Sequence, residues 1–393
     1  DILGRIAGIF NATSNPLGDS EDGHGQINAG IIMGNASLGT SDGAGFKLGQ
    51  GVAPQATVYA TKIFLNDFGP FDIGANTLTS LARNAQNAGA TFSNNSWGSS
   101  VDGEYTVDSA EFDALTRDAD PNEAGNQPMV YFFSTGNDGP ATGTIGAPAT
   151  GKNVIAVGAA ENSDADGTDG CLVGPSSSNN NRDLVDFSSR GPTEDNRFGV
   201  TVVAVGTHVN GIASTDAGYN GLGVCDQFFP AGQTNYARSS GTSHSCPVAC
   251  GAGMIVRELF NEQLASQGFP ANPSPALIRG ILANTATSLQ GGNDGDGGTI
   301  GHIPNSVQGW GSVNLANLLA FKDSLFVNDQ ETLFTATGQT HELLLIREDP
   351  TKPIKFTLTW TDVPGVPGAV SLVNNLDLEV VVNGTTFKGN VFS

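Results

Sequence analysis

Short apolar runs alternate with segments of helical periodicity through most of the chain. The pattern predicts strands at 57–65, 91–98, 128–133, 153–158 and 200–205, and helices at 78–88, 108–117, 247–256 and 275–286. Strands that alternate with helices are typical of a parallel sheet with helices on both faces. We therefore expect an α/β fold whose ligands bind beyond the carboxyl ends of the strands.

The hydrophobic period changes near the C-terminus. Residues 355–360 and 376–380 alternate between apolar and polar positions, which is typical of half-buried strands. This change divides the chain into a large α/β domain over 1–321 and a small antiparallel β-domain over 322–393. A chain of 393 residues is long enough for both.

The chain is acidic, with a formal net charge of −22 and no cluster of Lys and Arg. Phosphate backbones need a basic face, so nucleic acid is excluded as a partner. No apolar run approaches the ~20 residues of a membrane span. The acidity serves solubility in our interpretation, with a saline habitat or calcium-binding loops as alternatives. The chain starts at Asp1 with no methionine, so we expect a segment upstream of it.

Four cysteines fall into two classes. Cys246 and Cys250 lie four residues apart on a predicted buried helix and are interpreted as small core residues. Cys171 and Cys225 lie in polar, loop-like stretches and are free to pair, as secreted proteins allow. No spacing of Cys and His indicates zinc.

One serine stands where a small-residue loop meets a helix. Residues 239–242 lead to Ser243, and the helix after it is small and apolar on every side. Pro247 suits a first turn, where its missing N–H costs nothing. Unpaired N–H groups and the helix dipole favour negative charge near the hydroxyl, as a nucleophile attacking a carbonyl requires. A serine that only caps the helix is the alternative.

The stretch Gly241-Thr242-Ser243-His244-Ser245-Cys246-Pro247 resembles the serine loop of the subtilisin-like (subtilase) serine proteases, G-T-S-x-[SA]-x-P. Three other stretches resemble subtilase motifs: 24–30 (His24, Gly25, Ala29 and Gly30 match; Gln26, Ile27 and Asn28 depart), 135–140 around Asn137, and 187–192, F-S-S-R-G-P. The resemblance covers nearly the whole chain. It implies a subtilisin-like parallel sheet and a serine endopeptidase with an Asp/His/Ser triad.

The resemblance assigns roles to individual residues. Ser243 would be the nucleophile and His24 the general base, and the Asn137 amide would bind the oxyanion together with the Ser243 N–H. Three residues, Ser96, Trp97 and Gly98, would pair with an extended substrate, and Gly136 would line the pocket for the residue before the scissile bond. From the residues alone, 135–140 also fits a turn and 96–98 an ordinary strand end.

The family aspartate, in a D-[ST]-G turn well before the histidine, has no counterpart here. Asp1 has no strand in front of it, and Asp19 and Asp22 lie too close to His24. We expect the aspartate upstream of Asp1, which makes the given chain a fragment. A catalytically inactive subtilase-like protein that binds peptides is the rival reading.

The C-terminal stretch Leu372–Leu378 resembles the jelly-roll domain of the larger alkaline subtilases, and by that resemblance we expect the chain to end inside the domain. A stability or calcium module and a carbohydrate-binding role are alternatives for it. The insert at 161–199 contains acidic-Gly spacing at 164–170, for which we favour a solvated loop over calcium. We expect no cofactor for the chemistry, structural calcium as an option, polypeptide substrates, a monomer and secretion. His244 stands where many subtilases have an oxidisable Met, which predicts resistance to peroxide.

Overall fold

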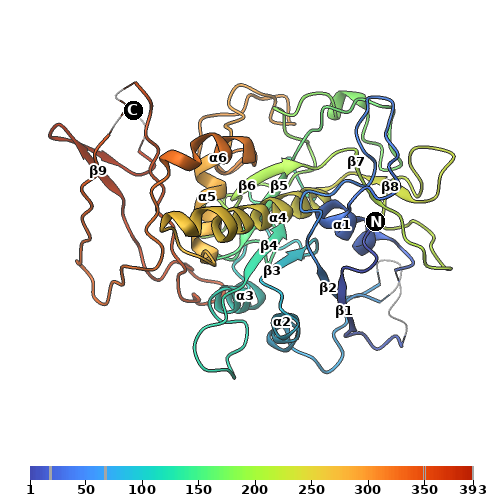
Figure 1. Cartoon of the computed structure of the whole chain (residues 1–393), viewed down its shortest axis with the longest axis horizontal. Coiled ribbons are helices and arrows are strands. Elements are labelled where there is room, and N and C mark those ends of the chain that lie inside the picture. The colour runs from blue at the N-terminus through green and yellow to red at the C-terminus, as the bar shows by residue number, and fades with distance from the viewer. Residues whose placement is uncertain (17–19, 66–68, 348, 350, 392–393) are drawn as a thin grey trace.

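A four-stranded parallel sheet lies at the centre of the computed structural model (Figure 1), which describes residues 1–16, 20–65, 69–347, 349 and 351–391. Its order is β3-β4-β5-β6, from β3 (Phe92–Asn95), β4 (Val130–Ser134), β5 (Ile155–Ala160) and β6 (Val202–Val205). Two strands, β1 (Ile6–Asn11) and β2 (Val58–Lys62), form a separate parallel pair. Two more, β7 (Val209–Ile212) and β8 (Tyr236–Ser239), form an antiparallel pair.

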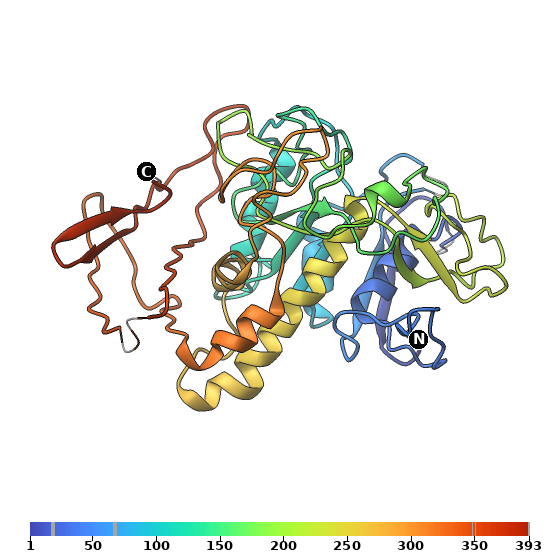
Figure 2. The same ribbon diagram turned by 90° about the horizontal axis from the view of Figure 1, so that it is seen from above.

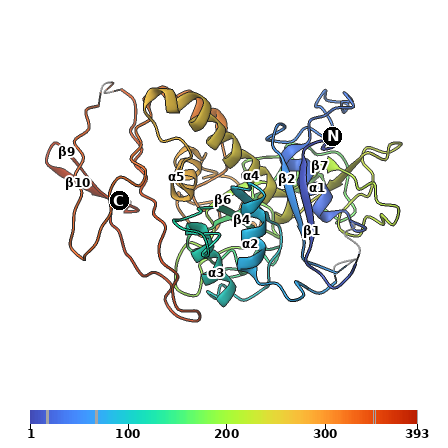
Figure 3. The same ribbon diagram turned by 60° about the horizontal axis from the view of Figure 1, so that its bottom comes forward.

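Helices cover both faces of the central sheet, as predicted (Figure 3). One face carries α2 (Leu78–Asn87) and α3 (Val107–Arg117), and the other carries α4 (Thr242–Leu259), α5 (Pro275–Thr285) and α6 (Leu315–Phe321). Successive side chains of a strand point to opposite faces. On β4, Val130 and Phe132 therefore pack with α4, while Tyr131 and Phe133 pack with α3.

Polar caps fix where several of these helices begin. The Thr77 hydroxyl accepts the Ser80 N–H, and the Ser80 hydroxyl accepts the Thr77 N–H, so α2 starts with a capping box. Ser274 caps α5 by accepting the Leu277 N–H at 3.0 Å, and Pro275 follows as the first helical residue. These caps place the first residues of α2 and α5 at the predicted starts, 78 and 275. Short helical turns make up the remainder: η1 (Pro175–Ser177), η2 (Phe260–Leu264), η3 (Ala265–Gln267) and η4 (Lys322–Ser324).

Small residues let α4 pass through the core. A Cβ on Gly253 would lie 2.8 Å from the Phe132 ring, and one on Gly251 would lie 2.7 Å from Val52. Cys246 and Cys250 are fully buried free thiols, which confirms their interpretation as core residues. The helix starts at Thr242, however, five residues before the predicted start. Pro247 is therefore its sixth residue and not part of a first turn, so that prediction was wrong.

The C-terminal part differs from the expected β-domain. Among the described residues of 322–393 the structure forms one two-stranded antiparallel hairpin, β9 (Glu379–Val382) with β10 (Thr385–Lys388), and no two-sheet jelly roll. The predicted strand at 355–360 is wrong, because those residues form no regular structure and join no ladder. Alternation reports only that two faces of a segment differ, whereas a strand also needs a partner.

Residues 355–374 are nevertheless fastened to the α/β part. The buried Asp362 carboxylate accepts from the Lys152 ammonium at 2.8 Å, and the Asp362 backbone exchanges two hydrogen bonds with the Asn153 side chain. The Arg279 guanidinium donates to the Trp360 carbonyl at 2.6 Å. The hairpin beyond lies at the end of the molecule away from the N-terminus (Figure 2).

No helix within the described ranges combines the length and the apolar character that crossing a membrane requires.

Candidate active site

Ser243 is the second residue of α4, at the carboxyl edge of the central sheet. Gly241 precedes the helix with φ 150°, a conformation that disfavours a side chain. The first N–H groups of a helix have no partner inside it and carry its positive dipole end. The Ser243 N–H is one of these groups. The structure therefore places this hydroxyl in the electrostatic setting that the sequence predicted.

Asn137 lies in the loop after β4 and contacts the same helix start. Its Oδ1 accepts hydrogen bonds from both the N–H and the hydroxyl of Thr242, each at 2.9 Å. With the carbonyl oxygen occupied in this way, the Nδ2 group turns to the other side. It lies 3.6 Å from where a Cβ on Gly241 would stand. The Asn137 amide is thus oriented by Thr242 and has N–H donors left for a ligand beside Ser243.

Ser96, at the end of β3, holds the nucleophile's own backbone. In a regular helix the Ser243 carbonyl would accept from the N–H of residue 247, but Pro247 has none. The Ser96 hydroxyl donates to that carbonyl at 2.7 Å instead. The Ser243 hydroxyl lies 3.5 Å from the Ser96 carbonyl. Sequence reasoning noticed both residues but missed this contact, because the two segments are 147 positions apart.

His24 is the first residue of α1 (His24–Met33), with Gly23 before it in the left-handed region at φ 82°. The His24 backbone N–H donates to Asp22 Oδ1 at 2.9 Å. A Cβ on Gly223 would lie 2.8 Å from that of His24, so only glycine permits this approach. Burial lowers the pKa of His24 below its ordinary 6.5, while the Asp22 carboxylate acts in the opposite direction. A neutral imidazole, able to accept a proton, is therefore favoured.

His244, on α4, contacts two residues of α1. Its ring centroid is 5.6 Å from that of His24, and its Nδ1 lies 2.9 Å from Asn28 Oδ1. Both Asn28 and His244 are buried. Sequence reasoning treated Asn28 as a departure from the motif and did not pair it with His244.

The three aspartates considered for the triad occupy different places. The Asp1 carboxylate accepts from the Ser37 N–H at 2.7 Å, and Asp22 accepts from the His24 backbone. Asp19 lies outside the described residues.

Of the residues predicted to bind substrate, Ser96 contacts Ser243, and the other three pack against neighbouring segments. The Trp97 ring stacks on Phe71, with centroids 5.5 Å apart, and so faces its own aromatic cluster. A Cβ on Gly98 would lie 2.7 Å from the Ala147 carbonyl, and one on Gly136 would lie 2.9 Å from Ser189 Oγ. Glycine is required at both positions because neighbouring segments approach their backbones closely.

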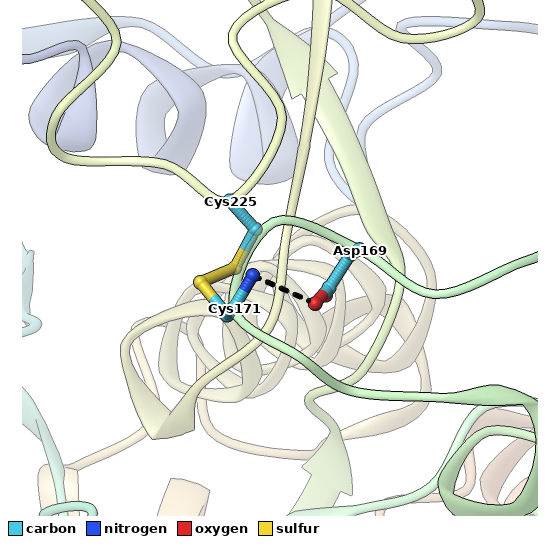
Figure 4. A group of neighbouring side chains, drawn as sticks. All are labelled: Asp169, Cys171 and Cys225. Atoms are coloured by element: carbon cyan, nitrogen blue, oxygen red, sulfur yellow. Dashed lines mark hydrogen bonds between the residues drawn. A yellow bond between two sulfur atoms is a disulfide. The ribbon is translucent and has the colours of Figure 1, made fainter.

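Cys171 and Cys225 form a disulfide beside Asp169 (Figure 4). The three side chains resemble a metal-binding cluster in proximity alone, but the two sulfur atoms are bonded to each other. The Asp169 carboxylate accepts from the Cys171 N–H at 3.0 Å and from the Ser240 hydroxyl at 2.6 Å. Ser240 lies three residues before Ser243. The disulfide-closed insert thus supports the segment that leads into α4.

Comparison with known proteins gives the family. Residues 9–311 match the subtilase family, which is most of the chain. The chain is 27% identical over 262 residues to the serine protease AprX of Bacillus subtilis, covering 65% of this chain and 53% of that protein. It is 26% identical over 242 residues to the serine protease/ABC transporter B family protein tagB of Dictyostelium discoideum, covering 51% of this chain but 13% of that protein.

Solved structures agree at the level of the fold. The psychrophilic protease S41 superposes with a TM-score of 0.51 at 22% identity, covering 79% of this chain and 90% of that one. Fervidolysin from Fervidobacterium pennivorans gives 0.50 at 22% identity, covering 81% and 42%. The chain therefore has a subtilisin-like fold and belongs to the subtilase family of serine proteases.

Proposed function

We propose that the protein is a serine endopeptidase that hydrolyses polypeptides through an acyl-enzyme intermediate. Its family supports polypeptide substrates, and the names of its relatives support peptide-bond hydrolysis. The observation that carries the proposal is the contact between Asn137 and Thr242, because it leaves the Asn137 amide donors facing the start of α4 beside Ser243.

The reaction would follow from the residues at this edge of the sheet. The Ser243 hydroxyl attacks the scissile carbonyl while His24 accepts its proton and then passes it to the leaving amine. The Asn137 amide and the Ser243 N–H stabilise the oxyanion of the tetrahedral intermediate. Water then attacks the acyl-enzyme by the same route. The lowered pKa of His24 supports its role as the base, because the neutral ring is the form that accepts a proton.

Substrate would bind as an added strand along Ser96, Trp97 and Gly98, with the Gly136 segment on the other side. The close packing of Gly98 against Ala147 supports this proposal, because it keeps the segment extended.

Labelling with a fluorophosphonate tests the proposal. We expect the protein to be labelled and Ser243→Ala to lose labelling entirely, while His24→Ala reacts at a rate at least ~10²-fold lower, as expected when a general base is removed. Ser266→Ala, which removes an exposed serine on η3, is the matched control and should label like the unaltered protein. A folded protein that takes no label would instead favour the inactive, peptide-binding relative.

Three further properties belong to the same proposal: secretion, a monomeric state and structural calcium. The Cys171–Cys225 disulfide supports an oxidising compartment. We also propose that the chain is related to the larger alkaline subtilases through Leu372–Leu378. Light scattering would report the mass in solution, and unfolding with and without a chelator would report calcium.

A further inference from the structure

A buried hydrogen bond connects the helix that carries His24 with the helix that carries Ser243. Asn28 lies four residues after His24 on α1, and positions four apart share one face of a helix. His244 directly follows Ser243 on α4. The 2.9 Å contact between Asn28 Oδ1 and His244 Nδ1 therefore joins the two helices close to the reacting side chains.

The partner atoms determine the state of His244. An amide oxygen only accepts hydrogen bonds, so Nδ1 must carry the proton and Nε2 is left bare in the neutral ring. Burial holds the pKa of His244 well below its usual range, and the neighbouring His24 lowers it further. Two charged groups act on this pair of rings: the Asp22 carboxylate raises the pKa of His24, and a protonated His24 lowers the pKa of His244. His244 is thus a neutral ring in one tautomer, fixed in orientation by Asn28.

The same ring touches the proposed base. The His24 and His244 rings are 5.6 Å apart with their planes inclined at 59°. These contacts form a closed loop. It runs from His24 along α1 to Asn28, through the hydrogen bond to His244, and back through the ring contact to His24. The position of His24 relative to α4 is constrained both by its own helix and by a ring that its helix holds in place.

We propose that Asn28 and His244 are a pair of positioning residues that set the placement of His24 beside Ser243. The pair rests on the proposed peptidase function, and neither residue transfers a proton or binds substrate in the proposed reaction. The two residues depend on each other, because either one without its partner leaves a buried polar group unpaired. Asn28 departs from the subtilase histidine motif, and His244 stands where many subtilases have Met. The two replacements therefore occur together in this chain, as a mutually dependent pair requires.

A double-mutant cycle tests this dependence. Asn28→Val removes the acceptor at similar size, His244→Met removes the ring, and the double variant removes both. We expect each single variant to lower kcat about 10- to 100-fold with KM within about threefold, since a displacement near 1 Å costs ~10²-fold. The double variant should be at least about tenfold faster than Asn28→Val, because no buried polar group is left unpaired.

Met33→Leu is the matched control, since Met33 is a buried residue of the same helix away from this contact. Its kcat should be unchanged. Single variants with unaltered kcat, or a double variant no faster than Asn28→Val, would overturn the positioning role.

A spectroscopic readout separates failure of the pair from failure of the proposed function. In 15N NMR spectra, His244 should show a protonated Nδ1 and a bare Nε2, and Asn28→Val should convert it to a mixture of tautomers. A protonated Nε2 in the unaltered protein overturns the pair even in an active enzyme. If the protein takes no fluorophosphonate label but His244 shows the expected tautomer, the Asn28–His244 hydrogen bond is real. The proposed function is then wrong, and the pair has no role in catalysis.

Discussion

Removing the Ser96 hydroxyl tests how the nucleophile's backbone is held. Ser96→Ala deletes the 2.7 Å donor to the Ser243 carbonyl, and Pro247 provides no N–H in its place. A buried carbonyl that loses its partner costs about 1–3 kcal/mol, and the half-buried Ser243 carbonyl should fall in the lower part of that range, about 1–2 kcal/mol. We expect the free energy of unfolding to fall by that amount in urea titrations. The measurement is made in the Ser243→Ala background, which keeps the carbonyl and removes the proposed nucleophile.

The same reasoning predicts a rescue. Pro247→Ala restores an N–H four residues after Ser243, where a regular helix would bond it. In the Pro247→Ala background, the cost of Ser96→Ala should therefore fall below about 0.5 kcal/mol, the range of ordinary surface substitutions. Ser100→Ala, which removes a hydroxyl from the exposed Asp138 carboxylate, is the control and should cost no more than that. An equal cost of Ser96→Ala in both backgrounds would refute the reasoning.

Five other outcomes are expected. Asn137→Ala should lower kcat about 10²- to 10³-fold with little change in KM, a figure obtained for an oxyanion donor in a member of this family; a change confined to KM would contradict the assigned role. Because burial lowers the pKa of His24, the acid limb of kcat/KM should lie below pH 6.5, and an acid limb at or above 6.5 would speak against His24 as the base. The lowered pKa values of His24 and His244 mean that the unfolded chain binds these protons first, so stability should decline as the pH falls below about 6.5 in urea titrations. Replacing Cys171 and Cys225 by Ala should cost up to ~4 kcal/mol, from a loop closed over 54 positions, and a loss under about 1 kcal/mol would contradict that account. Activity should survive peroxide, since His244 is not oxidised to a sulfoxide and Met33 and Met129 are buried; rapid loss of activity would disprove this.

Periodicity was sufficient to predict most of the fold. The helix at 108–117 and the strand at 153–158 lie within one or two residues of α3 and β5, because packing against a sheet enforces the spacing of their apolar residues. Asn137 was singled out through the resemblance of 135–140 to a subtilase motif, together with its place after a fully apolar strand. Local sequence pattern was thus sufficient to predict features that lie within a single helix, strand or loop.

Contacts between distant segments were not accessible in this way. The Asn28–His244 bond spans 216 positions, and neither residue alone indicates the other. The pairing of Cys171 with Cys225 was left open, because a spacing does not determine a partner. The strand predicted at 355–360 was wrong for the same reason. Alternation is a property of the segment itself, whereas a β-ladder requires a partner strand elsewhere in the chain.

The attachment at Asp362 determines which proteolytic cuts near the C-terminus leave the α/β part undisturbed. In the described residues after Asn374, the hydrogen bonds run within the hairpin of β9 and β10 and none reaches the first 321 residues. A cut between 375 and 378 would therefore release a short peptide and leave the Lys152–Asp362 pair in place. A cut before 352 would instead allow the whole fastened segment to dissociate. The Lys152 ammonium would then lose the Asp362 carboxylate, and the Arg279 guanidinium would lose the Trp360 carbonyl. Trimming by a protease should thus stall near Asn374, whose side chain donates a hydrogen bond to the buried Asp362 carboxylate.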